Sequence, residues 1–167
     1  ITLGGVDRED VTSAVLDALE LCDLSEGFAV TVVMGPSAPW RDKVMARVEK
    51  LPFPTIVLGN AHNMGALMCD ADLAIGGAGS TAWERCCLGL PSLQVVLAEN
   101  QRRIANALSD AGVACPLERS NLVVDLVQAM GSLAHDHMQL VRMSAAAAKV
   151  TDGQGAERVV QHIYQGC

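Results

Sequence analysis

The amino-acid sequence predicts an α/β fold, a doubly wound parallel sheet of the Rossmann type. Segments of apolar, often β-branched residues alternate along the chain with segments whose apolar residues recur at helical spacing. The strand-like segments are continuous apolar runs rather than alternating ones. Such runs are typical of parallel strands that helices cover on both faces.

The expected elements follow one another in strict alternation until the last third of the chain. Turn residues separate most of them, and Gly89 and Gly112 are placed to end two of the helices. The expected strands are 1–3, 28–34, 54–58, 71–75, 91–98 and 113–117. The expected helices are 11–22, 40–51, 64–69, 80–88, 101–111, 121–133, 135–148 and a last one that ends at Tyr164.

Composition narrows the class of protein. Half of the 167 residues are apolar and 19% are charged, which indicates an ordered globular chain. A net charge of -7 argues against nucleic acid as a partner. We expect residues 1–167 to form one domain without a membrane span. Because the chain starts inside an apparent strand without Met, we expect it to be a fragment of a longer protein.

The cysteines and histidines indicate no metal site. The six cysteines form no C-x-x-C pair, and the adjacent Cys86 and Cys87 should point to different sides of a helix. We expect free thiols in a reducing cytoplasm. His135 and His137 lie two residues apart in an expected helix, which places them on different faces.

Ligands of doubly wound sheets bind outside the carboxyl ends of the strands. Four loops follow strands here, namely 4–7, 59–63, 76–81 and 98–101. In the first, Asp7 is expected mainly to cap the next helix, with a sugar contact as the alternative. In the last, Asn100 is a natural N-cap, and Gln101 would face the same crevice.

The loop with Gly76, Gly77 and Gly79 has the composition of a phosphate-binding turn. Glycines allow close approach to backbone N–H groups, and the hydroxyls of Ser80 and Thr81 add hydrogen bonds. The alternative is a glycine turn with a helix cap, because Thr81-x-x-Glu84 matches a capping box. Glu84 is therefore either a capping residue or the acceptor for two ribose hydroxyls, and Trp83 beside it is expected to be buried.

A dinucleotide site is a competing interpretation of the same loop. Gly77-x-Gly79-x-x-Ala82 matches the fingerprint loosely, and Glu99 follows the next strand at about the expected 20 residues. The motif comes after the fourth expected strand, whereas the fingerprint belongs to the first strand-turn-helix unit. No serine-hydrolase elbow and no paired carboxylates are present. The residues indicate binding rather than catalysis.

Four stretches carry a family resemblance: "ITLGGVD" at 1–7, "GGAGSTAWERCCLGLP" at 76–91, "LAENQ" at 97–101 and "TDGQGAERVV" at 151–160. Together they resemble the C-terminal domain of the UDP-sugar hydrolases of pseudaminic acid biosynthesis. Relatives of that family include spore-coat polysaccharide biosynthesis proteins and, more distantly, the N-acetylglucosaminyltransferase of peptidoglycan synthesis. The resemblance implies the C-terminal, nucleotide-binding half of a GT-B fold.

The resemblance also implies a set of ligand-binding residues. The turn residues would hold the diphosphate, Glu84 the ribose, the 60–64 loop uracil through its backbone, the amide pair the sugar, and the first glycines would lie across the cleft. The implied residues are Gly4, Gly5, Asn60, Ala61, His62, Asn63, Met64, Gly77, Ala78, Gly79, Ser80, Thr81, Glu84, Asn100 and Gln101.

The family's proposed catalytic histidine lies in a Gly-His motif of the N-terminal domain, and this chain has no Gly-His pair. The resemblance therefore implies no catalytic residue here, no metal or cofactor, UDP or a UDP-sugar as ligand, and the missing N-terminal domain as partner. The whole enzyme would release UDP from a diacetamido-trideoxy-hexose on the route to surface sugars such as those of flagellin. A UDP-dependent glycosyltransferase half, an NAD(P)-binding module and a non-catalytic sugar-nucleotide sensor are the alternatives.

Overall fold

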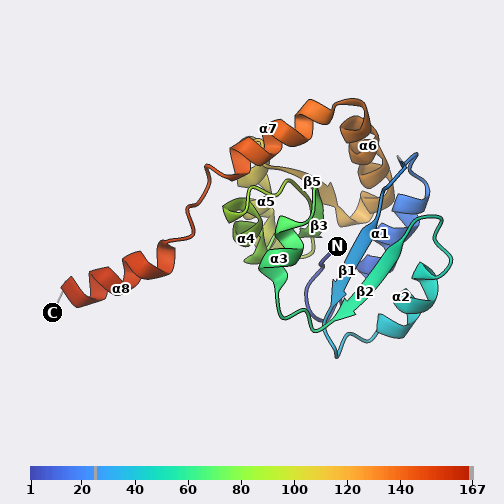
Figure 1. Ribbon diagram of the computed structural model, residues 1–167, viewed down its shortest axis with the longest axis horizontal. Helices are drawn as coiled ribbons and strands as arrows, with labels where there is room; N and C mark the ends of the chain where they lie inside the picture. The colour runs from blue at the N-terminus through green and yellow to red at the C-terminus, as the bar shows by residue number, and fades with distance from the viewer. Residues whose placement is uncertain (25, 166–167) are drawn as a thin grey trace.

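The computed structural model describes residues 1–24 and 26–165, apart from the side chain of His137. Helices and strands alternate through the first two thirds of the chain, and three helices close it (Figure 1). The elements are α1 (Val11–Glu20), β1 (Val30–Met34), α2 (Arg41–Val48), β2 (Thr55–Gly59), α3 (Met64–Cys69), β3 (Ala74–Gly77), α4 (Thr81–Cys87), β4 (Ser92–Val96), α5 (Glu99–Asp110), β5 (Ala114–Glu118), the 3₁₀ turn η1 (Arg119–Asn121), α6 (Leu122–His135), α7 (His137–Ala147) and α8 (Gly155–Gln165).

The strands form two parallel groups, β1–β2 and β3–β4–β5. The segment 1–3 joins them. On one side, Val33 N donates to Ile1 O at 2.8 Å, and on the other, Thr2 N donates to Ile75 O at 2.9 Å. Thr2 also forms a parallel bridge with Gly76. Counted as the first strand, this segment gives the order 3-2-1-4-5-6, the doubly wound arrangement that the sequence predicts.

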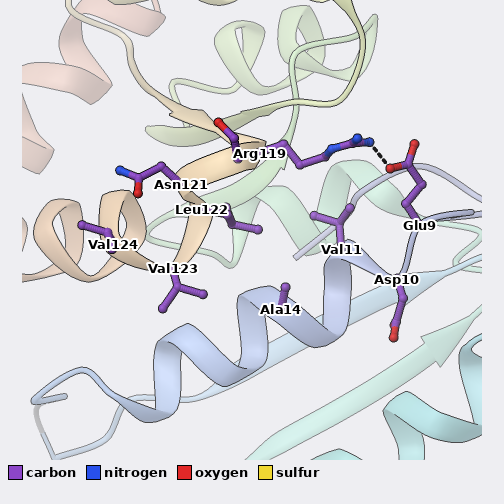
Figure 2. A pocket seen from close by; sticks show the side chains of 10 residues that line it. Glu9, Asp10, Val11, Ala14, Arg119, Asn121, Leu122, Val123 and Val124 are labelled. Carbon is purple, nitrogen blue, oxygen red and sulfur yellow. Dashed lines mark hydrogen bonds and ion pairs between the residues drawn. The ribbon is translucent and has the colours of Figure 1, made fainter.

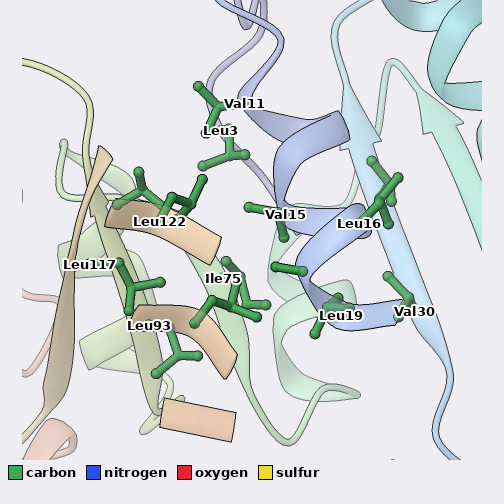
Figure 3. Packing of buried hydrophobic residues seen from close by; sticks show 14 of the residues in the cluster. Leu3, Val11, Val15, Leu16, Leu19, Val30, Ile75, Leu93, Leu117 and Leu122 are labelled. Atoms are coloured by element: carbon green, nitrogen blue, oxygen red, sulfur yellow. The ribbon is translucent and has the colours of Figure 1, made fainter. Parts of the chain in front are cut away.

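One large core cluster holds this sheet together. Val15, Leu16 and Leu19 of α1 pack with α6 and with strand residues such as Ile75 and Leu93 (Figure 3). A second cluster joins α4, α5 and α7 through the small side chains of Ala82, Cys86 and Ala147 together with Leu108. Because these strand residues are buried under helices, continuous apolar runs were the right signal for this sheet.

Two differences from the predicted element boundaries bear on the candidate site. The strand expected at 71–75 lies at Ala74–Gly77, so Gly76 and Gly77 are paired with Gln94 and Val95 of β4 rather than lying in the turn. Hydrogen bonding along β4 extends the strand past the point where the apolar side chains end. The helix expected from Gln101 begins at Glu99 with Ala98 as N-cap, so the prediction of Asn100 as N-cap was wrong.

The last helix differs from the others because it buries none of its residues. Figure 1 shows α8 lying apart from the rest of the chain, at the end of an extended segment. Val159, Val160, Ile163 and Tyr164 are exposed and follow helical spacing. Within the described residues, none of the helices combines the length and apolar character that crossing a bilayer requires.

Candidate functional site

Neighbouring strand ends bring the predicted loops together along one edge of the sheet. Asn60 N, after β2, donates to Met34 O at the end of β1 at 3.4 Å. Gly35 N, after β1, donates to Gly5 O at 3.0 Å, which places the 4–7 loop beside β1. The bridge between Thr2 and Gly76 then sets that loop next to the end of β3. This edge of the sheet, at the switch in strand order, is where doubly wound folds bind ligands.

The Gly4–Gly5 turn lies tightly against the residue after β1. Gly4 has a φ of 89°, a backbone conformation that favours glycine. A Cβ added to Gly35 would lie 2.2 Å from Gly5 O, so the two loops touch through their backbones. Gly4 and Gly5 themselves have no neighbour within 4 Å of an added Cβ, so the turn faces open space.

Asp7 is engaged at the start of α1. Its side chain is buried, and its two carboxylate oxygens accept from Val11 N at 3.0 Å and from Thr12 N at 2.9 Å. The prediction that Asp7 caps this helix is confirmed. Its carboxylate therefore occupies the first two N–H groups of α1, which makes this helix start a poor place for a phosphate.

The Ala78–Thr81 turn after β3 keeps its N–H groups available. Ala82 N and Trp83 N donate to Gly79 O and Ser80 O, both at 3.0 Å. Within the part of the chain that the structure describes, the N–H groups of Gly79, Ser80 and Thr81 have no hydrogen-bond partner. Three consecutive free donors suit an acceptor with several oxygens, as a phosphate group has.

Gln101 lies beside this turn, as predicted for the amide pair. Its Oε1 accepts from Leu97 N at 3.2 Å, which holds the side chain back over the end of β4. A Cβ placed on Gly79 would lie 3.8 Å from Gln101 Nε2. Asn100 is exposed in the first turn of α5, and no described residue forms a hydrogen bond with its side chain. The structure therefore brings Gln101 to the turn but does not show the same for Asn100.

Glu84 forms no capping interaction with the start of α4 among the described residues. Ser80, not Thr81, is the N-cap of α4, and it makes no side-chain capping bond. The Glu84 side chain is exposed and forms no hydrogen bond with the described residues. The capping-box interpretation was therefore wrong, and the carboxylate is free for a ligand. Trp83 is 42% exposed, so the expectation of a buried tryptophan was also wrong.

The loop after β2 is ordered by its own side chains. Asn60 adopts a φ of 62°, and its Nδ2 lies 3.3 Å from His62 Nε2. Asn63 caps α3 by accepting from Ala66 N at 3.1 Å. Ala61 and Met64 are half-buried. These contacts hold the side chains of Asn60, His62 and Asn63 within the loop.

Arg85 is the residue of this region that sequence reasoning missed. Its side chain is 1% exposed, and Nη2 donates to Gly77 O at 2.7 Å. Burial lowers the pKa of the guanidinium to about 10, which still leaves it charged at neutral pH. The one signal that the sequence offered was its place in an expected helix, directly before Cys86.

Among the described residues, the thiols and imidazoles form no second site. Cys86 is buried and Cys87 exposed, which confirms that they point to different sides. Burial raises the pKa of the Cys86 thiol, so it stays protonated. Cys167 lies outside the described residues. Asp136 separates the helices that hold His135 and His137, and no group of His, Cys, Asp and Glu in the described ranges could hold a metal ion.

A separate hollow of about 360 Å³ lies between the start of α1 and the η1–α6 corner. Figure 2 shows Arg119 reaching across to Glu9, with which it forms an ion pair, while Val123 and Val124 line the other side. The hollow contains none of the predicted site residues. Its charged groups are already paired, Arg119 with Glu9 and Asp10 with Lys43, so the free donors of the Ala78–Thr81 turn remain the stronger candidate.

A comparison with known protein families shows to which family this chain belongs. The model of the glycosyltransferase family 28 C-terminal domain matches residues 1–159. The chain belongs to this family. This membership gives the expected GT-B half fold independent support.

Individual relatives agree with this assignment. The chain is 28% identical over 170 residues to the spore coat polysaccharide biosynthesis protein SpsG of Bacillus subtilis (strain 168), which covers 99% of this chain and 50% of that protein. Among solved structures, Acinetobacter baumannii MurG superposes with a TM-score of 0.81 at 20% identity over 98% of this chain and 49% of its own. WaaG, a glycosyltransferase involved in lipopolysaccharide biosynthesis, gives 0.71 at 22% identity, over 92% and 42% of the two chains.

The two structures establish the fold, and at 20% and 22% sequence identity they support no conclusion about function. The prediction of the C-terminal half of a GT-B fold is confirmed. The resemblance to spore-coat polysaccharide proteins is also confirmed, through SpsG. The family 28 domain spans about half the length of the relatives that it matches.

Proposed function

We propose that this family 28 domain binds the UDP moiety of a UDP-sugar at the Ala78–Thr81 turn, as the nucleotide-binding half of a UDP-dependent glycosyltransferase. The observation that carries the proposal is the run of three N–H groups, at Gly79, Ser80 and Thr81, that have no hydrogen-bond partner among the described residues. These donors can bind a diphosphate without a metal ion. They also suit a chain of net charge -7, because a backbone grip needs no cluster of lysines and arginines.

In this proposal, neighbouring loops bind different parts of the UDP-sugar. The free Glu84 carboxylate accepts from the two ribose hydroxyls. The backbone of the 60–64 loop contacts uracil, and Gln101 and Asn100 face the sugar, with Gly4 and Gly5 across the cleft. The uracil loop and the phosphate turn are three strand spacings apart, roughly 14 Å, a span that an extended nucleoside diphosphate can bridge.

Membership of a glycosyltransferase family favours transfer to an acceptor over hydrolysis. The UDP-sugar hydrolase of pseudaminic acid biosynthesis stays the second candidate, on the strength of the Trp83-Glu84-Arg85 and Asn100-Gln101 stretches. In either reaction the domain would hold the UDP leaving group and stabilise its developing charge. The catalytic base and the acceptor site would come from an N-terminal partner domain.

Titration calorimetry with UDP, UDP-N-acetylglucosamine and NAD tests the proposal. We expect UDP and the UDP-sugar to bind and NAD not to bind. Binding of NAD without UDP would instead support the dinucleotide interpretation, and binding of none of the three would refute a nucleotide site. Incubating a UDP-sugar with the protein that contains both halves then separates the two reactions, because a hydrolase releases UDP without any acceptor.

A further inference from the structure

Arg85 is the charged side chain in the structure whose burial is hardest to explain by stability. It is 1% exposed, and its Nε and Nη1 atoms have no hydrogen-bond partner among the described residues. Among the described residues, no carboxylate forms a hydrogen bond with it; the charge of the adjacent Glu84 acts on it, but that side chain is exposed. A buried guanidinium without a carboxylate hydrogen-bonded to it is costly, and an apolar side chain of similar volume would be more favourable.

The local structure makes room for this side chain. Side chains of a helix tilt toward its N-terminus, so Arg85 reaches back over the first turn of α4 toward the end of β3. A Cβ on Gly76 would lie 2.3 Å from Arg85 Nη1, so this space exists because residue 76 is a glycine. The guanidinium therefore reaches the strand two and three residues before Gly79.

The hydrogen bond to Gly77 O acts on the turn that follows. A peptide unit is planar, so a carbonyl held by Nη2 at 2.7 Å fixes the plane that contains Gly77 O and Ala78 N. The direction in which the chain enters the Ala78–Thr81 turn is set by that plane. At the same time, the positive charge lies at Gly77, two residues before the first of the three free N–H groups, and a bound anion at the turn would add a counter-charge.

We propose that Arg85 is the positioning residue of the phosphate-binding turn, and that its charge makes the site selective for phosphate-bearing ligands over the bare nucleoside. This inference rests on the proposed function, since it assumes that the turn binds the diphosphate of UDP. Arg85 does not touch the ligand. It orients the donors that do, and it adds a charge that the solvent does not screen.

The test compares UDP with uridine, which lacks the phosphates, by titration calorimetry on wild type and variants. Arg85→Met is expected to weaken UDP binding about tenfold or more and to leave uridine binding unchanged. Arg85→Lys, which keeps the charge, should recover most of the UDP affinity. Arg142→Met removes an equal charge from the exposed surface of α7 and should change neither affinity.

Each outcome decides a different question. A purely structural role predicts equal losses for UDP and uridine in Arg85→Met, or no recovery in Arg85→Lys, and either result overturns the inference. Wild-type affinity for UDP in Arg85→Met overturns it as well and leaves the proposed function standing. Absence of UDP binding by the wild type overturns both. If Arg85→Met does not fold, Arg85→Gln takes its place, because glutamine keeps an N–H donor without the charge. The quantity compared is again the loss of affinity for UDP relative to that for uridine.

Discussion

Replacing Glu84 by Ala separates the ligand-binding role of this residue from the capping role that its spacing suggested. In the structure the carboxylate is exposed and forms no hydrogen bond with the described residues. Its removal should therefore change the free energy of unfolding by no more than about 0.5 kcal/mol, as for an ordinary surface position. A lost cap would cost about 1 kcal/mol.

The effect on binding should be much larger. A hydrogen bond to a charged acceptor contributes about 1.5 kcal/mol at the lower end of its range, which suits an exposed site. Two ribose hydroxyls then give about 3 kcal/mol, or about 100-fold in the dissociation constant of UDP. Pyrophosphate has no ribose, so its affinity for the Ala78–Thr81 turn should stay the same.

The assay is a pair of calorimetric titrations, UDP and pyrophosphate, with urea unfolding of the same samples. Glu49→Ala serves as control, because Glu49 is an exposed glutamate just after α2. Equal losses for UDP and pyrophosphate would show that Glu84 shapes the turn instead of binding the ribose. A drop in unfolding free energy near that of a lost cap, without a change in UDP affinity, would refute the reasoning altogether.

Three further predictions concern the fold around the site. Leu126→Ala, at a fully buried position of α6, should lower the unfolding free energy by about 3 kcal/mol in urea titrations, and a loss below about 1 kcal/mol would contradict the packing described. Ending the chain after Gln154 removes α8, which buries no residue, so the melting temperature should move by less than about 2 °C, and a larger fall would reveal contacts that the structure lacks. Hydrogen bonds from Arg102 lower the pKa of the Glu118 carboxyl. The ion pair therefore stabilises the fold above the ordinary pKa of a glutamate, and this contribution is lost as the pH falls through the lowered pKa. In an NMR titration, Arg102→Met should return the pKa of Glu118 to its usual range, and an unchanged pKa would exclude the ion pair.

Much of the architecture was predictable because it depends on local patterns. The helix Met64–Cys69 has the predicted bounds, and α1, β1 and β2 agree within two residues at most ends. Buried parallel strands must be apolar along their length, and helices must repeat apolar residues on one face, so both leave their mark in the chain. The same patterns placed the glycine turn after the fourth strand and so disfavoured a dinucleotide site.

The details of the turn were not predictable in this way. Gly76 and Gly77 belong to β3 because β4 supplies their partners, and no local pattern reports on a neighbouring strand. The Thr81-x-x-Glu84 spacing permits a capping box, yet Ser80 begins the helix and leaves Glu84 free. Trp83 is exposed although its type favours burial, because its place on α4 faces away from the core.

Sequence by itself determined that this chain forms a doubly wound sheet with a glycine-rich turn at a strand end, because periodicity and turn chemistry are properties of adjacent residues. Tertiary structure alone decided which groups meet there. The segment 1–3 lies between β1 and β3 and thereby creates the switch in strand order, Asp7 accepts from the first two N–H groups of α1, and the buried Arg85 holds the carbonyl of Gly77 just before the turn. These contacts depend on strand order and on the space that Gly76 leaves for Arg85 because it has no side chain. Neither is encoded by a local sequence pattern.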